Sequence, residues 1–296
     1  MTAREILRMG EEVLVQADVP EAKINAWYLF SYCFGETDET GQRRPMERGA
    51  FFLREGEEMR EEALSEYKGL LARRAERIPL EYLIHETEFM GLPFFVNEHV
   101  LIPRQDTECL VEEVLQVSNG KDVLDLCCGS GCIGVSLAVL GQCQSVTMAD
   151  ISREALRVAR RNAVKNHAAV DTVQSDLFSG LKGKFDIIVS NPPYIPTDEI
   201  DELMPEVRDY EPRLALDGAG DGLFFYRSII KESRYFLEKG GVLCFEIGCS
   251  QAESVAALME QAGFTGVTVK KDLAGLDRIV RGTWDEKEYR TGKTDR

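Results

Sequence analysis

The first 85 residues carry the hydrophobic spacing of α-helices. Apolar residues recur at every third or fourth position over residues 24–33, which is the period of a helix with one buried face. A second apolar stripe runs through the charged segment 57–77 and predicts a long amphipathic helix. Residues 18–21 (Asp-Val-Pro-Glu) match a capping box with a proline in the first turn. We therefore expect a small all-α domain over residues 1–85.

Residues 86–105 break this pattern. Apolar residues cluster over residues 87–96 and 100–102, around a Gly-Leu-Pro turn at residues 91–93. Short apolar runs about such a turn are typical of strands. We expect a hairpin-like linker over residues 86–105.

From residue 106 onward, short apolar runs alternate with amphipathic runs of helix length. This alternation predicts an α/β domain over residues 106–296, with a parallel sheet covered by helices on both faces. The expected strands are residues 122–126, 145–149, 170–174, 185–190, 241–247, 267–270 and 278–281. The expected helices are residues 131–140, 152–166, 221–238 and 250–261.

Composition and charge exclude several classes of function. A chain of 296 residues has room for about two domains. Its 35 Lys and Arg residues and 51 Asp and Glu residues give a net charge of −16. This charge argues against binding to nucleic acid phosphates or to an anionic membrane surface. The sequence lacks both a run of roughly 18 apolar residues, as in a membrane span, and the start of a signal peptide. Its eight cysteines lack the paired spacing of a zinc site and fit a reducing cytoplasm, so we expect no metal.

A Gly-rich turn follows the expected strand at residues 122–126. Its residues are Cys127, Cys128, Gly129, Ser130 and Gly131. Glycines let a backbone approach a ligand, and the helix N-terminus that follows presents free N–H groups. Asp150 closes the next strand, where a carboxylate can accept hydrogen bonds from ribose hydroxyls. We expect an adenosine-containing cofactor, but Gly129, Gly131 and Gly134 also match the dinucleotide fingerprint, so the turn leaves NAD and S-adenosylmethionine open.

A second motif stands at the end of the expected strand at residues 185–190. It reads Asn191, Pro192, Pro193 and Tyr194. The two prolines make a stiff loop whose carbonyls stay free as acceptors, Asn191 adds a side-chain acceptor, and Tyr194 adds a flat aromatic face. These groups suit a planar NH₂ group conjugated to a π system, such as an amide or an aromatic amine. The motif therefore favours methyl transfer to such a nitrogen.

These motifs resemble those of amino-group methyltransferases that use S-adenosylmethionine, and the chain as a whole resembles the HemK/PrmC family, the release factor glutamine methyltransferases. The segment at residues 101–108 (Leu-Ile-Pro-Arg-Gln-Asp-Thr-Glu) is similar to a signature of that family. Further similar stretches are residues 77–83, 88–94, 210–216 and 220–222. The resemblance implies a Rossmann-like class I methyltransferase fold, with a seven-stranded mixed sheet and a small helical N-terminal domain that recognises the substrate.

The resemblance also implies roles for the residues of both motifs. Cys127 to Gly131 would wrap the methionine part of the cofactor, Asp150 would hold the ribose, and Leu177 would pack on the adenine. Asp176, which precedes Leu177, could accept a hydrogen bond from the adenine amino group. Asn191 to Tyr194 would bind the glutamine of the Gly-Gly-Gln motif in class-1 peptide chain release factors, with Asn191, Pro192 and Tyr194 in the catalytic roles. We expect a monomer that binds release factors and no nucleic acid directly.

Two departures from the family pattern stand in the cofactor site. Cys127 replaces the first glycine of the turn, so this position must have a negative φ or carry strain. Leu177 stands where some relatives have an aromatic residue. Three other functions remain open: an adenine-N6 nucleic-acid methyltransferase, an NAD-dependent dehydrogenase, and a non-enzymatic adaptor. The −16 charge weighs against the first, and the second leaves the Asn-Pro-Pro-Tyr motif unexplained.

Overall fold

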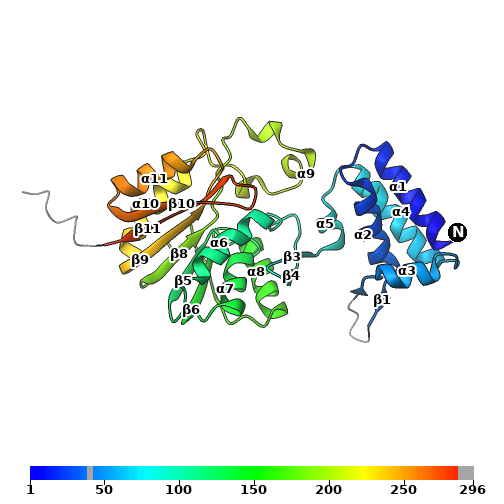
Figure 1. Cartoon of the computed structure of the whole chain (residues 1–296), viewed down its shortest axis with the longest axis horizontal. Coiled ribbons are helices and arrows are strands. Elements are labelled where there is room, and N and C mark those ends of the chain that lie inside the picture. Colours follow the sequence, from blue (N-terminus) through cyan, green and yellow to red (C-terminus); the bar gives the residue numbers. More distant parts are fainter. Residues whose placement is uncertain (39–42, 286–296) are drawn as a thin grey trace, which may run out of the picture. The chain divides into compact units, whose positions relative to one another are not determined.

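The computed structural model describes residues 1–38 and 43–285 and divides into two compact units (Figure 1). The first unit holds Met1–His85 and also Met204–Tyr210, and the second holds Glu86–Leu203 and the chain from Glu211 onward. The predicted boundaries assign residues 204–210 to the catalytic domain, whereas the structure groups them with the helical unit. The chain thus leaves the second unit at Leu203 and returns to it at Glu211.

The first unit is built from helices. They are α1 (Ala3–Gln16), α2 (Ala22–Phe34), α3 (Arg48–Arg54), α4 (Glu61–Ala75), α5 (Leu80–Ile84) and the short α9 (Pro205–Arg208), with a minimal strand pair β1 (Glu36–Thr37) and β2 (Arg43–Arg44). Aromatic rings of α2, α3 and α4 fill its core, with Phe30 packing edge-on against Phe51 and Tyr67. Gly10 of α1 permits this packing, because a Cβ there would lie 1.9 Å from the Tyr67 hydroxyl oxygen.

The predicted capping box at residues 18–21 is wrong. Helix α2 begins at Ala22, and its N-cap residue Glu21 has a left-handed φ of 52° and makes no side-chain cap. The Asn25 side chain, in the first turn of α2, instead donates to the carbonyls of Pro20 and Glu21. These hydrogen bonds stabilise the turn that precedes the helix. A capping box does exist at α1, between Thr2 and Glu5.

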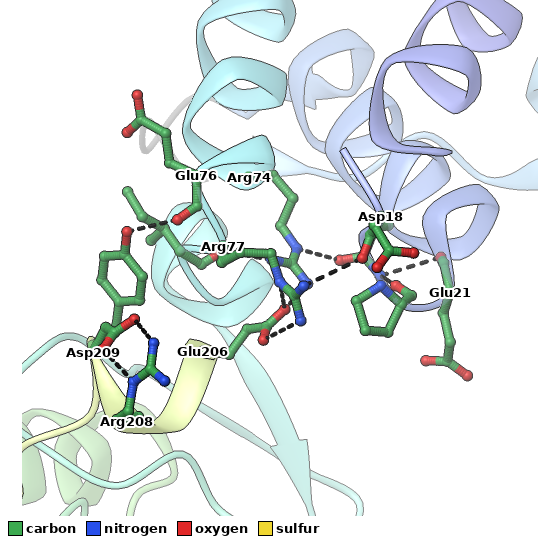
Figure 2. Close-up of polar contacts among 12 residues, drawn as sticks. Asp18, Glu21, Arg74, Glu76, Arg77, Glu206, Arg208 and Asp209 are labelled. Carbon is green, nitrogen blue, oxygen red and sulfur yellow. Dashed lines mark hydrogen bonds and ion pairs between the residues drawn. The ribbon is translucent and has the colours of Figure 1, made fainter. Parts of the chain in front are cut away.

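An ionic cluster joins α9 to α4 within the first unit (Figure 2). Glu206 accepts hydrogen bonds from Arg77 Nε and Nη2, both at 2.7 Å, and from Arg74 Nη2 at 2.9 Å. The Arg74 side chain is only 5% exposed and also donates to Asn25 Oδ1. Burial acts to raise the pKa of Glu206, but the hydrogen bonds from the two arginines outweigh it and lower that pKa. At the end of the segment, the Tyr210 hydroxyl donates to the carbonyl of Glu76.

The second unit contains a seven-stranded mixed sheet, as predicted. The strand order is β10-β11-β9-β8-β5-β6-β7, in which β11 runs antiparallel to both neighbours and the other pairs are parallel. The strands are β5 (Asp122–Leu126), β6 (Ser145–Asp150), β7 (Asp171–Gln174), β8 (Phe185–Ser190), β9 (Leu237–Glu246), β10 (Phe264–Lys271) and β11 (Asp277–Trp284). A separate hairpin pairs β3 (Thr87–Phe89) with β4 (Leu92–Phe94).

Helices cover both faces of this sheet (Figure 1). Successive strand residues point to opposite faces: Val123 packs in the cluster on one side and Leu124 in the cluster on the other. The first cluster includes residues of α6 (Gln105–Leu115), α7 (Cys132–Leu140) and α8 (Arg153–Lys165), and the second includes residues of α10 (Phe224–Phe236) and α11 (Ala252–Gln261). Two 3₁₀ turns, η1 (Ile200–Glu202) and η2 (Arg213–Ala215), lie in the loops.

Two parts of the sequence-based assignment of elements need correction. The predicted strand at residues 100–102 does not form; there, the Ile102 N–H donates to the carboxylate of Glu211. Helix α6 was missing from the prediction, although its buried Thr107, Leu110, Val111 and Val114 follow helical spacing. Residues 286–296 of the predicted catalytic domain lie outside the described residues. No helix in the described part of the chain is long and apolar enough to span a membrane.

Candidate active site

A cavity of about 450 Å³ opens at the carboxyl edge of the parallel strands. Residues that follow β5, β6, β7 and β8 all contribute to its wall. In open α/β sheets this edge is where ligands bind. The volume lies in the range of small-molecule sites, so this cavity is the candidate active site.

The Gly-rich turn forms one wall of the cavity. Gly131 caps α7 with a φ of 78°, and a Cβ on Gly134 would lie 2.6 Å from Met148 Cγ, so both positions require glycine. Cys127 has a φ of 61°. Of the two conformations that the sequence leaves open for Cys127, the structure has the strained left-handed one.

Asp125 stabilises this turn through a hydrogen bond, and it was not predicted as a site residue. It is completely buried in β5, and its Oδ2 accepts a 2.8 Å hydrogen bond from the Gly134 N–H. Burial raises the pKa of Asp125 to about 7, against the opposing effect of that hydrogen bond. Its position in the apolar strand sequence Asp-Val-Leu-Asp-Leu was the available signal, because an unpaired carboxylate in a core is costly.

Asp150 joins the end of β6 to the Gly-rich turn. Its Oδ2 accepts from the Gly129 N–H at 2.9 Å, and its Oδ1 accepts from the Ser152 N–H at 2.8 Å. Burial raises the pKa of Asp150, although these N–H groups favour its ionised form. Each carboxylate oxygen can accept a further hydrogen bond, so the group is fixed in place and still able to bind hydroxyls.

The loop after β7 contributes Asp176 and Leu177 to the cavity wall. Leu177 is half-buried and has a φ of 45°, while its carbonyl accepts a hydrogen bond from the Ser175 hydroxyl. Asp176 is exposed. The turn therefore presents one apolar and one acidic side chain side by side.

The Asn-Pro-Pro-Tyr loop is fixed by its neighbours in the fold. The Gln251 side chain donates to the Tyr194 carbonyl at 2.9 Å, and Ile195 pairs with residues 216–218. Added Cβ atoms at Gly218 and Gly222 would lie within 2.7 Å of Tyr194 backbone atoms. These contacts hold the loop on several sides, which is favourable for orienting a bound group.

The structure brings most of the predicted site residues into one cavity. Nine of them line it: Cys127, Cys128, Gly129, Ser130, Asp150, Asp176, Leu177, Asn191 and Pro193. Three do not line it: Gly131, Pro192 and Tyr194. Gly131 caps α7, Pro192 is buried, and the half-buried Tyr194 ring packs against the apolar cluster of α10 and α11.

The wall also contains residues from outside the two motifs. The segment 98–104 contributes His99 and Arg104, and the start of α10 contributes Phe225. Arg104 donates to Glu211 at 2.6 Å, whereas Glu108 lies away from the wall and accepts from the Met90 N–H of the hairpin. The segment 98–104 forms no helix or strand, and the apolar run that predicted a strand at residues 100–102 did not indicate that the segment lines the cavity.

Comparison with known proteins identifies the family. Residues 5–84 match the model described as PrmC N-terminal domain, and residues 105–206 match that described as Methyltransferase small domain. A release factor glutamine methyltransferase of Geobacter sulfurreducens is 40% identical over 283 residues, which cover 95% of this chain and 96% of the relative. A relative of the same name from Clostridium acetobutylicum is 43% identical over 231 residues, covering 75% and 81%. This chain belongs to the release factor glutamine methyltransferase family.

Membership confirms the resemblance and decides between the two cofactors, because this methyltransferase family uses S-adenosylmethionine. Among solved structures, a methyltransferase from Pyrococcus furiosus has a TM-score of 0.53 at 18% identity and covers 67% of this chain and 91% of its own. That likeness supports the class I methyltransferase fold of the second unit.

The cavity of this release factor glutamine methyltransferase homologue fits the cofactor. A Cβ added at Gly129 would meet no atom within 4 Å, so the turn borders open space that a ligand can fill. Asp150 and Asp176 are acidic wall residues, which suits a ligand that carries a positive sulfonium. In the described part of the chain, no group of three or more His, Cys, Asp or Glu side chains is arranged to hold a metal ion.

Proposed function

We propose that this chain transfers a methyl group from S-adenosylmethionine to the side-chain amide nitrogen of the glutamine in the Gly-Gly-Gln motif of class-1 peptide chain release factors. One observation carries the proposal: Asn191 and Asp150 line the same cavity, so the loop that we assign to the amide and the carboxylate that we assign to the ribose share one site. The relatives' name, release factor glutamine methyltransferase, supports the substrate.

The cofactor is held by the residues that line its side of the cavity. The turn from Cys127 to Gly131 wraps its methionine part, and Asp150 accepts hydrogen bonds from the ribose hydroxyls. Leu177 packs on the adenine, and Asp176 accepts from the adenine amino group. S-adenosylmethionine supplies a methyl group on a positively charged sulfur.

The substrate amide is a poor nucleophile because its lone pair is delocalised. Asn191 Oδ1 and the Pro192 carbonyl accept its two N–H hydrogen bonds, which orients the nitrogen and raises its electron density. Pro193 and Tyr194 complete the loop that holds the glutamine. The new N–CH₃ bond forms as the S–CH₃ bond breaks, and an N–H proton leaves to water. Catalysis is then mainly orientation of the two groups.

The helical unit contributes to recognition of the release factor, and the enzyme acts as a monomer in the cytoplasm, where translation ends. Direct binding to nucleic acid is disfavoured by the net charge of −16. The adenine-N6 alternative remains an outcome of the test.

The deciding experiment is methyl transfer from labelled S-adenosylmethionine to a purified class-1 release factor. Two further lanes hold a release factor in which alanine replaces the motif glutamine, and a DNA duplex. We expect label in the first lane alone. Label on the duplex alone would move the function to nucleic acid, and equal label on both release factors would refute the target residue.

Two variants separate the roles of the cavity walls. Asn191→Ala should lower turnover by roughly 10²-fold, in the range for one positioned polar group, with cofactor affinity nearly unchanged. Asp150→Ala should weaken cofactor binding first, and the matched control Asp171→Ala, at an exposed position outside the cavity wall, should bind normally. Titration calorimetry measures affinity, and a collapse of binding in Asn191→Ala would contradict the role given to Asn191.

A further inference from the structure

A buried glutamate stands directly behind the amide-binding loop. Glu246 ends β9 and is 2% exposed. The preceding residue, Phe245, pairs with Ser190 of β8, so Glu246 and Asn191, the residue after β8, lie at the ends of neighbouring strands on the same sheet edge. Neither motif contains Glu246, and it does not line the cavity.

Thr107 of α6 connects the two groups. It is 2% exposed, and Asn191 Nδ2 donates to its Oγ1 at 3.4 Å. Burial raises the pKa of Glu246 to about 7, while hydrogen bonds with Thr107 and Asn191 act in the opposite direction and favour the carboxylate. Glu246 Oε2 has no hydrogen-bond partner within normal distance in the part of the chain that is described, so the carboxyl retains unused acceptor capacity.

The charges around Glu246 come from several elements. Arg278 of β11 favours the carboxylate and Asp106 of α6 opposes it. In the described part of the chain, the other titratable groups that interact with it are Tyr194, Tyr226 of α10 and Cys132 of α7. The only cation among these groups is Arg278, which is also paired with Asp272 and Asp106.

The chemistry of these groups sets the direction of the Asn191 amide. A carboxylate only accepts hydrogen bonds, whereas an amide has a donating and an accepting end. Beside Glu246, the amide must therefore turn its Nδ2 inward, and its Oδ1 remains for another donor. With the amide reversed, its oxygen would face the carboxylate in a buried, water-poor place, which is costly.

We propose that Glu246 is a positioning residue for methyl transfer: acting with the Thr107 hydroxyl, its carboxylate fixes the Asn191 amide with Oδ1 directed at the substrate N–H group. This inference rests on the proposed function of Asn191 and adds what orients it. As the substrate nitrogen becomes positive in the transition state, its N–H groups become stronger donors. A negative charge behind Asn191 strengthens the acceptor that they meet.

The first test is the pH profile of turnover with saturating release factor and cofactor. We expect kcat to rise with pH through about 7 as Glu246 ionises. In Glu246→Gln, this rise should disappear and the plateau should fall on the order of 10-fold, as for groups that orient a directly binding ligand. The KM for S-adenosylmethionine should be unchanged. The control Glu113→Gln, at a buried glutamate that pairs with Arg281 away from the cavity, should keep the wild-type profile.

Thr107 gives a matched pair of variants. Thr107→Val keeps the shape and removes the hydroxyl, so kcat should fall, whereas Thr107→Ser should restore most of it. A profile that stays the same in Glu246→Gln, or equal activity of the two Thr107 variants, would overturn the proposal.

A spectroscopic titration tests the contact without the reaction. Infrared difference spectra of the full chain, with Glu246→Gln as reference, follow the carboxylic acid band of Glu246 against pH. Thr107→Val and Asn191→Ala should each raise its midpoint, because each removes a hydrogen bond that favours the carboxylate. An unmoved midpoint would refute the link. If the wild type fails to methylate release factor, the proposed function fails while this titration still decides the contact between Glu246 and Asn191.

Discussion

At Cys127, the backbone conformation is unfavourable, whereas the packing of the side chain is favourable. Its left-handed φ of 61° costs a residue with a Cβ about 1–2 kcal/mol relative to glycine. Its half-buried side chain packs against the apolar cluster that contains Leu126 and Phe245. The strain is therefore offset in part by packing, at a position that lines the cofactor cavity.

This balance predicts opposite outcomes for two substitutions of Cys127. Cys127→Gly removes the strain and should leave the unfolding midpoint and the affinity for S-adenosylmethionine close to those of the wild type. Cys127→Val adds a β-branched side chain at positive φ, which is a conformational outlier, and should lower both. Thermal unfolding and titration calorimetry on the two variants provide the measurement. A valine variant as stable and as tight-binding as the wild type would show that the turn relaxes freely.

The residues that we propose to contact ligands were easier to predict than those that support them. Asp150 ends β6 and Asn191 directly follows β8. Both stand in recognisable motifs, so the sequence alone predicted that they share a site. Asp125 and Glu246 are instead buried residues that support the cavity wall without lining it. Their signal was a carboxylate within an apolar strand, which indicates a buried charge but does not say which group it faces.

At the scale of elements, the segment from Met204 to Tyr210 belongs to the helical unit although the sequence on either side belongs to the methyltransferase unit. Glu206 accepts most of the side-chain hydrogen bonds that join this segment to the rest of the helical unit (Figure 2). Its side chain is 12% exposed and that of Arg74 is 5% exposed. Removing one partner of such a pair leaves a charge buried without its counter-ion.

Glu206→Gln should therefore destabilise the helical unit by roughly 3 kcal/mol, the lower end for a broken buried pair. It should also make residues 204–210 more sensitive to proteolysis. Binding of S-adenosylmethionine should be unchanged, because Glu206, Arg74 and Arg77 do not line the cavity. Urea unfolding and limited proteolysis measure the first two effects. The control is Glu202→Gln, at an exposed position of the turn η1; equal sensitivity of both variants would contradict the role of Glu206.

Strongly periodic elements were predicted to within a few residues, and irregular ones were not. The strands β5 and β8 have the predicted bounds, because both are short, mainly apolar runs that end at turn residues. The predicted strand at residues 100–102 failed because a run of three apolar residues does not reveal whether a partner strand exists. The segment containing α9 could not be predicted either, since four helical residues carry no measurable period and its ion pairs span about 130 positions of sequence.

For the whole molecule, buried carboxyl groups link stability to pH. Burial raises the pKa of both Asp125 and Glu246 to about 7, from ordinary values of 3.8 and 4.5. Between those limits the folded chain binds more protons than the unfolded chain, so the free energy of unfolding falls as pH rises. Above about pH 7 both groups are ionised in both states, and their contribution becomes constant.

The carboxyl groups with lowered pKa values act at a different pH. Hydrogen bonds from Arg227 lower the pKa of Asp221 to about 2, and the pKa of Glu206 is also lowered. Groups of this kind stabilise the fold above the unfolded pKa, and the contribution is lost only as pH falls through their folded pKa. They therefore add little slope between about pH 5 and 8.

The chain should thus be less stable at about pH 8 than at about pH 5, with a difference of several kcal/mol at about 1.4 kcal/mol per pKa unit. Asp125→Asn and Glu246→Gln should each reduce the slope, because a neutral amide in place of the buried acid removes its titration. Asp221→Asn should leave the slope between about pH 5 and 8 unchanged, since that exposed acid is already ionised there. Urea unfolding across this range measures the slopes. If both buried-acid variants kept the wild-type slope, then neither carboxyl would remain protonated in the folded chain near neutral pH, and the rise of kcat attributed to Glu246 would need another origin.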